Sequence, residues 1–279
     1  MSDIISLQNH AYTELHQLPQ TVKKTKGKQL LKILILAMLL FLAGNAVYYL
    51  FILPFNATAK IQFSGIDTSL EADLKKAAGL TGTEKWGKLN KDVLLYRITS
   101  YPIVAEARVI KKYPDKVLID ITERKPVGIL LATVADRTIP MEIDKTGTVF
   151  KVSSKKDSQE LPVISGLSFQ TIRAGMKVHK QLVPLFKQLD LLKRKNPVLL
   201  SEISEMKIEQ KKYGGFDLIL YPVRTHIKVR TDSTLNEDRL QYMILTLDVI
   251  RDLKMSSKIE ELDVRGGTAS YRLRGETDE

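Results

Sequence analysis

The sequence predicts an α+β protein with one N-terminal transmembrane helix followed by two domains that combine sheets with helices. Two observations predict this class. An uncharged apolar run of membrane length lies near the N-terminus, and short amphipathic strands and helices follow it to the end of the chain. The 279 residues are 44% hydrophobic and 27% charged, a composition that supports packed cores beside a membrane anchor.

The transmembrane helix is predicted at residues 33–53, ILILAMLLFLAGNAVYYLFIL. At about 1.5 Å per residue it spans a bilayer core of ~30 Å. The first charge after it is Lys60, whereas five lysines precede it: Lys23, Lys24, Lys26, Lys28 and Lys32. The positive-inside rule therefore predicts that residues 1–32 are a cytoplasmic tail and that the chain beyond Pro54 lies across the membrane.

A cleavable signal peptide is the alternative, because Ala57-Thr58-Ala59 matches the small-x-small cleavage pattern. The apolar run is longer than the 7–15 residues of a signal h-region, and this favours an uncleaved anchor.

The first domain is predicted at residues 59–131, beginning with a strand at residues 59–63. Thr68 with Glu71 forms a capping box for a helix that ends at Gly79. A second helix starts at Asn90 and stops at Pro102.

A hairpin completes the first domain. Two alternating stretches flank a Tyr113-Pro114-Asp115 turn, and Lys111 is expected to be exposed. The residues expected to face the core are Ala105, Ala107, Val109, Val117, Ile119 and Ile121. The order strand, helix, helix, strand, strand predicts two helices on a three-stranded sheet, whose edges are either protected or used to capture another strand.

The second domain is predicted at residues 132–279, as a curved sheet carrying helices. Strands are expected at 141–144, 148–152, 161–164, 203–208, 216–221, 226–230, 259–264 and 269–273. One helix is expected at 180–195. Another is expected at 234–252, capped by Thr234 with Glu237, and its core face is Leu240, Met243, Ile244, Leu247 and Ile250.

Several short motifs occur in a fixed order after the apolar run. They are Ile61-Gln62-Phe63-Ser64-Gly65, Tyr101-Pro102, Val109-x-x-x-Tyr113-Pro114, Ile119-x-Ile121-x-Glu123-Arg124-x-Pro126-Val127, Asp144-x-x-Gly147-x-Val149-Phe150 and Leu161-Pro162-x-Ile164-x-Gly166. In this order they resemble the POTRA domain and following region of the FtsQ/DivIB cell-division family. The match is looser in the last thirty residues, where Asp263-Val264-Arg265 is followed by Gly266 and family members commonly have Tyr.

The resemblance implies a non-enzymatic bitopic scaffold of the bacterial divisome in the cell membrane, concentrated at the division septum. It implies partners of the FtsL and FtsB/DivIC type, small bitopic proteins, and a role in coupling early division proteins to septal wall synthesis. It also implies that a partner adds a strand to the last strand of the chain. The residues carried over as a group are Ala269, Ser270, Tyr271, Arg272 and Leu273.

The residues themselves indicate no cofactor, metal or catalytic site. There are no cysteines, which excludes disulfides and thiolate ligands. His10 and His16 lie in the tail, and His179 and His226 have no neighbouring His, so zinc binding is not favoured. The net charge of +11 is spread along the chain, which argues against nucleic-acid binding but allows attraction to anionic lipid or wall polymer.

The competing class is a membrane-tethered wall-binding or wall-cleaving protein, because a carboxylate pair acting on sugar has no sequence signature. Three residues keep two interpretations. Glu123-Arg124 is either a binding corner or a surface ion pair. Trp86 is either a partner anchor or a lid on its own core, and Asn45 is either a contact for a helix in the bilayer or a tolerated polar residue.

Overall fold

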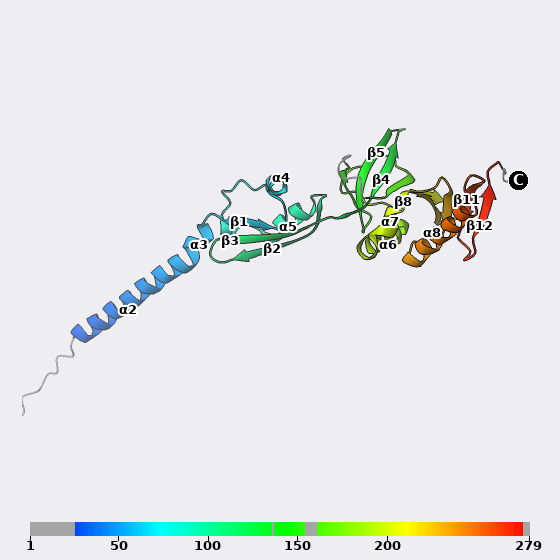
Figure 1. The fold of residues 1–279 in the computed structure, drawn as a ribbon. Coiled ribbons are helices and arrows are strands. Elements are labelled where there is room, and N and C mark those ends of the chain that lie inside the picture. Colours follow the sequence, from blue (N-terminus) through cyan, green and yellow to red (C-terminus); the bar gives the residue numbers. More distant parts are fainter. Residues whose placement is uncertain (1–25, 136, 154–160, 276–279) are drawn as a thin grey trace, which may run out of the picture.

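The structure, a computed structural model, describes residues 26–135, 137–153 and 161–275. Most of the expected cytoplasmic tail and the polar stretch 154–160 therefore lie outside the described residues. The described chain forms a long helix, a three-stranded sheet and a nine-stranded sheet, which follow one another along an elongated molecule (Figure 1).

The N-terminal helical segment is continuous and contains the predicted anchor. It consists of α2 (Lys26–Val47), a π-helical turn (Tyr48–Ile52) and α3 (Leu53–Asn56). Gly27–Asn56 is long and apolar enough to cross a membrane, with a mean hydropathy of 2.3, and no part of its most apolar stretch is buried in protein. Asn45 donates from Nδ2 to the Phe41 carbonyl at 2.9 Å, so its amide group has a partner within its own helix.

The first domain has the predicted order of elements. Its strands are β1 (Lys60–Ser64), β2 (Val104–Lys112) and β3 (Lys116–Glu123), and its helices are α4 (Thr68–Ala78), the 3₁₀ turn η2 (Trp86–Lys88) and α5 (Lys91–Thr99). The sheet order is β1-β3-β2, with β1 parallel and β2 antiparallel to β3. Leu74 and Ile98 from the two helices are fully buried against Val109 and Ile119 of the hairpin.

Three local expectations for this domain are wrong. The N-cap of α4 is Asp67 and not Thr68, which is already the first helical residue. The Asp67 side chain makes no capping hydrogen bond. Ala105 is exposed because the register shifts between Val104 and Glu106, which turns Val104 to the core instead. Lys111 is half-buried, and its Nζ donates to the carbonyls of Trp86 and Leu89 at 2.7 and 2.9 Å.

The second domain is built on a nine-stranded sheet in the order β12-β11-β10-β9-β8-β7-β4-β5-β6. The pairs β4–β7, β7–β8 and β10–β11 are parallel, and the other neighbours are antiparallel. The strands are β4 (Pro126–Val134), β5 (Arg137–Asp144), β6 (Val149–Val152), β7 (Val163–Ser168), β8 (Ile203–Gln210), β9 (Phe216–Pro222), β10 (Lys228–Thr231), β11 (Ile259–Asp263) and β12 (Ser270–Leu273).

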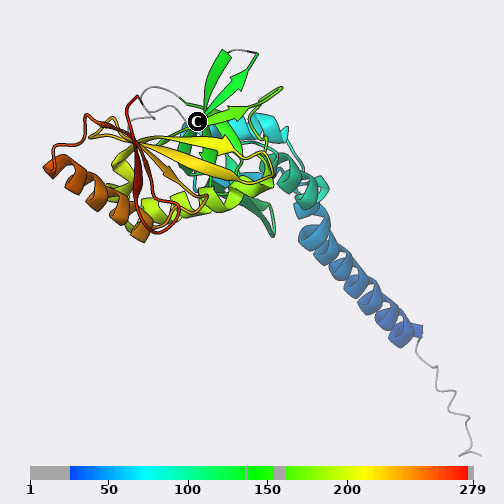
Figure 2. The ribbon, with the colours of Figure 1, turned by 90° about the vertical axis from the view of Figure 1, so that its right-hand side faces the viewer.

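Helices cover the large sheet. They are η3 (Lys180–Leu182) with α6 (Val183–Lys195), the unpredicted α7 (Pro197–Ser201), and α8 (Glu237–Asp252). In Figure 2, α6 and α8 lie along the same side of the strands. Phe186 and Leu189 of α6 and Leu240 and Met243 of α8 share one buried core with the sheet. Asn236 caps α8 instead of Thr234, because its side-chain oxygen accepts from the Arg239 amide at 2.9 Å.

The junction between the sheets lies earlier than expected. The expected boundary after residue 131 falls inside β4, which pairs with β5 and β7 of the large sheet. β4 was not among the expected strands, and periodicity does not reveal which strand another one pairs with, since pairing is non-local. Arg124 joins the two parts: its Nε donates to the Pro102 carbonyl at 2.9 Å, and its Nη1 donates to Oδ2 of buried Asp144 at 2.5 Å.

Candidate partner-binding edge

The last strand, β12, is an edge strand of the nine-stranded sheet. It pairs antiparallel with β11 after a turn through Gly266 and Gly267, and Gly267 has a φ of 79° that a residue with a side chain rarely adopts. Within the described residues no strand pairs with its other side. Of the five residues expected to form the site, Ala269 lies just before β12, and the other four form it.

The direction of the backbone groups follows from one hydrogen bond. The Arg274 amide donates to the carbonyl of Lys258, the residue just before β11, at 2.8 Å. Successive residues of an extended strand turn their N–H groups to opposite edges, so the amides of Arg272 and Ser270 also face β11. The Tyr271 amide therefore points towards the outer edge, where an added strand would lie.

The side chains of β12 divide between the two faces of the sheet. Tyr271 lies opposite Leu262 and is 55% exposed, whereas Leu273 is half-buried and packs against the core of the domain. Arg272 lies on the other face and reaches Glu261 with Nη2 at 3.3 Å. Tyr271 is therefore the large apolar side chain of this strand that remains accessible to a partner.

An ionic ladder crosses the sheet behind β12. Arg230 on β10 donates to Glu261 on β11 from Nε at 2.5 Å and to Glu209 on β8 from Nη1, and Glu261 also accepts from Arg272. Partial burial opposes the charge of Arg230, but the hydrogen bonds and negative charges of the two glutamates outweigh it and raise its pKa. The ladder connects the edge strand electrostatically to the interior of the sheet.

A second ionic group fixes the turn that leads into β12. Arg265 donates to both carboxylate oxygens of Asp263 and, from Nη1, to buried Asp217 at 2.8 Å. The hydrogen bond from Arg265 holds the pKa of Asp263 below its ordinary value, and the pKa of Arg265 is raised correspondingly. Asp263 and Arg265 are thus turn anchors here, although the residue after them differs from the family pattern.

A hollow of about 670 Å³ opens beside this edge, and Arg274 just after β12 helps to line it. Val198 and Leu199 of α7 and Ile244 and Leu247 of α8 supply its apolar lining. His226 also lines it, while His179 caps η3 by accepting from the Gln181 amide. Among the described residues no group of three His, Cys, Asp or Glu side chains could hold a metal ion.

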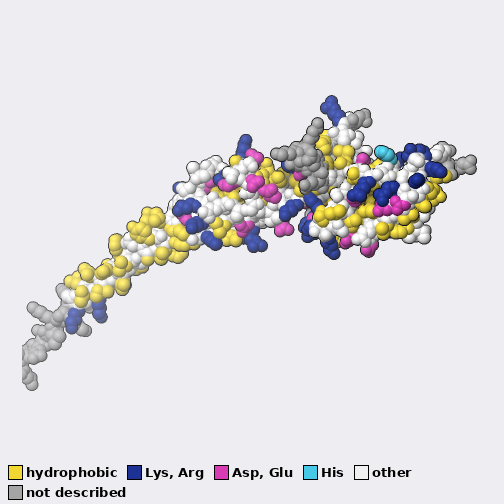
Figure 3. Space-filling model, in the orientation of Figure 1, with side chains coloured by type: hydrophobic (Ala, Val, Ile, Leu, Met, Phe, Trp, Pro, Cys, Tyr) yellow, Lys and Arg dark blue, Asp and Glu magenta, His cyan; other side chains and the backbone are white. Residues whose placement is uncertain are grey.

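The outer face of α8 carries an apolar stripe that the sequence analysis missed. It consists of Tyr242, Leu245, Val249 and Leu253 just beyond the helix, each at least 37% exposed. Their spacing of three, four and four residues places them on one face, and a search for a second helical face would have found them. Figure 3 shows hydrophobic side chains over this end of the molecule.

Two residues with open interpretations have internal contacts. Arg124 pairs with Asp144 rather than with Glu123, so it joins the domains. Trp86 is half-buried against the core of the first domain, and its Nε1 donates to the Lys116 carbonyl at 3.1 Å, which favours a lid on its own core.

In the described part of the chain, one apolar helix is followed by a small βααββ domain and a large mixed sheet with helices, which together define a POTRA-bearing chain with one candidate membrane span among these residues. Residues 57–124 match the family model "POTRA domain, FtsQ-type". The chain carries an FtsQ-type POTRA domain and is a distant homologue of proteins named cell division protein FtsQ.

Three of these relatives show the extent of the similarity. The protein from Geotalea daltonii is 25% identical over 78% of this chain and 80% of its own length. The protein from Myxococcus fulvus is 24% identical over 53% of this chain and 51% of its own length. The protein from Syntrophotalea carbinolica is 30% identical over 40% of this chain and 39% of its own length, so these last two matches span about half of each relative or less.

Proposed function

We propose that this protein is a non-enzymatic, single-pass scaffold of the bacterial division machinery. Its N-terminus would lie in the cytoplasm and both sheet domains would lie across the membrane. The observation that supports this function best is the FtsQ-type POTRA domain directly after one membrane-length helix. The proposed order is a cytoplasmic tail at residues 1–32, a membrane span at residues 33–53, the POTRA domain and the sheet domain. The last two meet at the junction near Arg124.

The uncleaved anchor is supported by contacts of the would-be cleavage site. The Ala59 amide donates to the Glu84 carbonyl at 2.8 Å, and the Trp86 amide donates to the Ala57 carbonyl at 2.8 Å. Ala59 is also buried. Residues 57–59 are thus part of the folded domain rather than an exposed linker.

A reporter active only outside the cytoplasm tests the topology. Fused after Glu279 it should be active, and fused before Lys23 it should be inactive. Extraction of membranes should return the full-length chain. The opposite reporter pattern, or release of a species that begins at Lys60, would contradict the proposed topology.

The proposed partners are small bitopic proteins of the FtsL and FtsB/DivIC type, which would add a strand to the outer edge of β12. The outward Tyr271 amide supplies the donor for such a ladder, and the exposed Tyr271 side chain supplies selectivity. The apolar stripe of α8 and the hollow beside Arg274 would accept the apolar residues that flank the added strand.

Binding at β12 is tested by co-purification from detergent-solubilised cells, with mass spectrometry identifying the captured proteins. Tyr271→Pro removes the outward donor, and we expect a loss of partner capture of at least tenfold. Tyr271→Ala keeps the amide and should retain part of the capture, which separates the backbone contribution from the side-chain contribution.

Both variants should remain folded, because the Tyr271 amide does not pair with β11. Wild-type capture by folded Tyr271→Pro would exclude this edge as the docking site. The competing function, a wall-binding or wall-cleaving protein, predicts retention on purified peptidoglycan and no small bitopic partners.

A further inference from the structure

The first domain is docked against the end of the membrane helix through its hairpin tip. Pro54 has no N–H, so the Leu50 carbonyl lacks the donor that an ordinary helical turn would provide. The Tyr113 hydroxyl at the hairpin tip donates to this carbonyl at 2.6 Å. The tip therefore hydrogen-bonds directly to a backbone carbonyl near the end of the helix.

A second contact fixes the same end of the domain. The Phe55 ring lies so close to Gly87 that a Cβ at Gly87 would approach Phe55 Cδ2 to 2.3 Å, so this position needs glycine. Trp86 and Tyr113 meet edge to face with ring centroids 6.3 Å apart. The helix end and the first domain thus form one packed unit.

This contact sets the height of the hairpin tip relative to a bilayer. With Lys32 at the cytoplasmic surface, a core of ~30 Å reaches about twenty residues further, to the region of Leu53. Leu50 lies three residues, about 4.5 Å at 1.5 Å per residue, short of that level. Tyr113 and its neighbours therefore lie among the lipid headgroups, where tyrosine and tryptophan rings are favoured.

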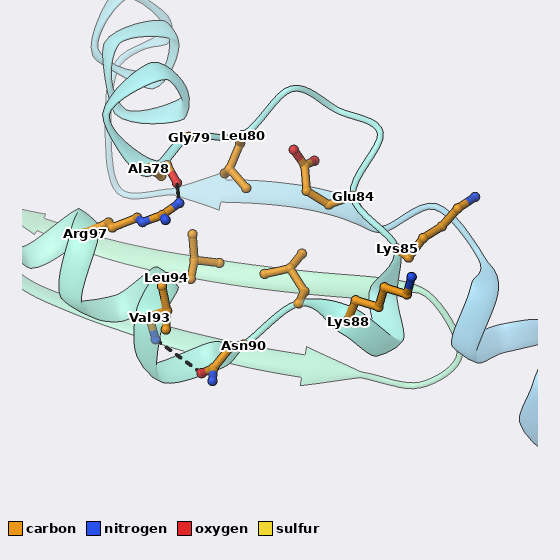
Figure 4. Close-up of a pocket in the computed structure, with 11 residues that line it drawn as sticks. Ala78, Gly79, Leu80, Glu84, Lys85, Lys88, Asn90, Val93, Leu94 and Arg97 are labelled. Atoms are coloured by element: carbon orange, nitrogen blue, oxygen red, sulfur yellow. Dashed lines mark hydrogen bonds between the residues drawn. The ribbon is translucent and has the colours of Figure 1, made fainter.

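Four exposed lysines surround this contact: Lys85, Lys88, Lys112 and Lys116. The backbone of Lys85 forms a β-bridge with Thr58 just beyond the helix, and Lys112 lies opposite Lys116 in the strand register at the hairpin tip. Figure 3 shows basic side chains where the first domain meets the helix. In Figure 4, Lys85 and Lys88 lie at the end of a hollow nearer the pale blue helical segment, while Arg97 at its other end donates to the Ala78 carbonyl.

The nearby acidic side chains have other partners. Asp115 pairs with Lys60 at 2.7 Å. Glu84 accepts from the amides of Thr81 and Gly82 at 2.5 and 3.0 Å. No ion pair joins the four lysines to an acid within the described part of the chain, so their charges are available to a ligand.

We propose that this lysine cluster (Lys85, Lys88, Lys112 and Lys116) binds anionic phospholipid headgroups of the membrane that α2 crosses. Lipid is favoured over a soluble anionic polymer because the Tyr113 contact with Leu50 holds the cluster at headgroup level. Bound lipid would fix the orientation of the POTRA domain relative to the bilayer. This inference rests on the proposed single-pass topology.

The chain contains a single tryptophan, Trp86, which makes the test site-specific. The full-length protein is placed in nanodiscs of phosphatidylcholine with phosphatidylglycerol, with a trace of either lipid carrying a pyrene group on its acyl chain. Energy transfer from Trp86 to labelled phosphatidylglycerol should exceed transfer to labelled phosphatidylcholine about twofold or more. Salt at about 0.5 M should remove most of this preference, because it screens charges beyond a few ångströms.

The variant Lys85→Gln/Lys88→Gln/Lys112→Gln/Lys116→Gln should lose most of the preference. A matched control, Lys180→Gln/Lys187→Gln/Lys195→Gln/Lys254→Gln, removes the same charge from exposed positions of the second domain and should keep it. Equal preference in the first variant and the wild type would overturn the inference. So would a salt-independent preference, which remains measurable on the wild type even if that variant fails to fold.

Two further outcomes separate this inference from the proposed topology. A chain that fails to enter nanodiscs would contradict the membrane anchor itself. A chain that enters them with the predicted topology, but shows no preference for the anionic lipid, would contradict only the lysine cluster. Competition by added wall teichoic acid with no lipid preference would identify a soluble polymer as the ligand instead.

Discussion

The two hairpins at opposite ends of the sheet domains differ in how firmly their own chain holds them. The β2–β3 hairpin has eight residue pairs, and its tip and flank donate to Leu50, Trp86 and Leu89. The β11–β12 hairpin has four pairs, and Tyr271 at its edge is 55% exposed. Polar groups that are already satisfied internally serve the fold, whereas an open edge leaves its hydrogen bonds for another chain.

The largest expected effect tests the tightly held hairpin. Val109→Asp should unfold the first domain, because a carboxylate beside Ile119 in a dry core costs several kcal/mol, comparable to the stability of a small domain. Circular dichroism and urea unfolding measure the effect. Ile110→Asp, one residue along and 36% exposed, is the matched control and should remain folded. A folded Val109→Asp would show that the hairpin is less firmly packed than described.

The junction between the two sheet domains ranks second. Asp144→Ala removes the acceptor for Arg124 and for the amides of Thr146 and Thr148, leaving the mostly buried guanidinium without its ion pair. We expect a loss of about 2–3 kcal/mol in the free energy of unfolding and a wider range of interdomain angles by small-angle scattering. Exposed Lys145→Ala in the same turn should change neither quantity.

The contacts of Lys111 provide a smaller test of the first hairpin. Lys111→Ala removes two hydrogen bonds to carbonyls and a cation–π contact of 4.4 Å with Trp86, which should lower stability by about 1–2 kcal/mol. Urea unfolding with Trp86 fluorescence reports both stability and the ring's environment. Lys112→Ala, its exposed neighbour, should lie within about 0.5 kcal/mol of the wild type. Equal effects of the two variants would mean that the contacts of half-buried Lys111 contribute nothing specific to stability.

The smallest effect concerns pH and the turn before β12. Asp263 has a lowered pKa in the folded chain because Arg265 donates to it, so the folded state favours its ionised form. This contribution is present above the unfolded pKa of about 4 and is lost as the pH falls through the lower folded value. Asp263→Asn should therefore be less stable than the wild type at pH 7, and this difference should shrink near pH 3. Thermal unfolding at the two pH values checks the sign.

Local sequence determined the elements of this protein. The uncharged run of residues 33–53, the helical faces around Leu74 and Leu240, and the alternation of the β2–β3 hairpin each follow from spacing along a few turns or residues. These patterns depend only on neighbours in the chain, so they predicted the α+β class and the order of strands and helices in the first domain, but β4 and α7 of the second domain were not among the expected elements.

Tertiary structure decided everything that depends on residues distant in sequence. Only the fold assigned β4 to the large sheet and paired Arg124 with Asp144. It placed the side chain of Lys111 against Trp86, where it is half-buried. It also brought Tyr113 to the Leu50 carbonyl and turned the Tyr271 amide outward. The physical reason is that strand partners, ion pairs and edge directions are set by register and packing between separate segments, about which local periodicity carries no information.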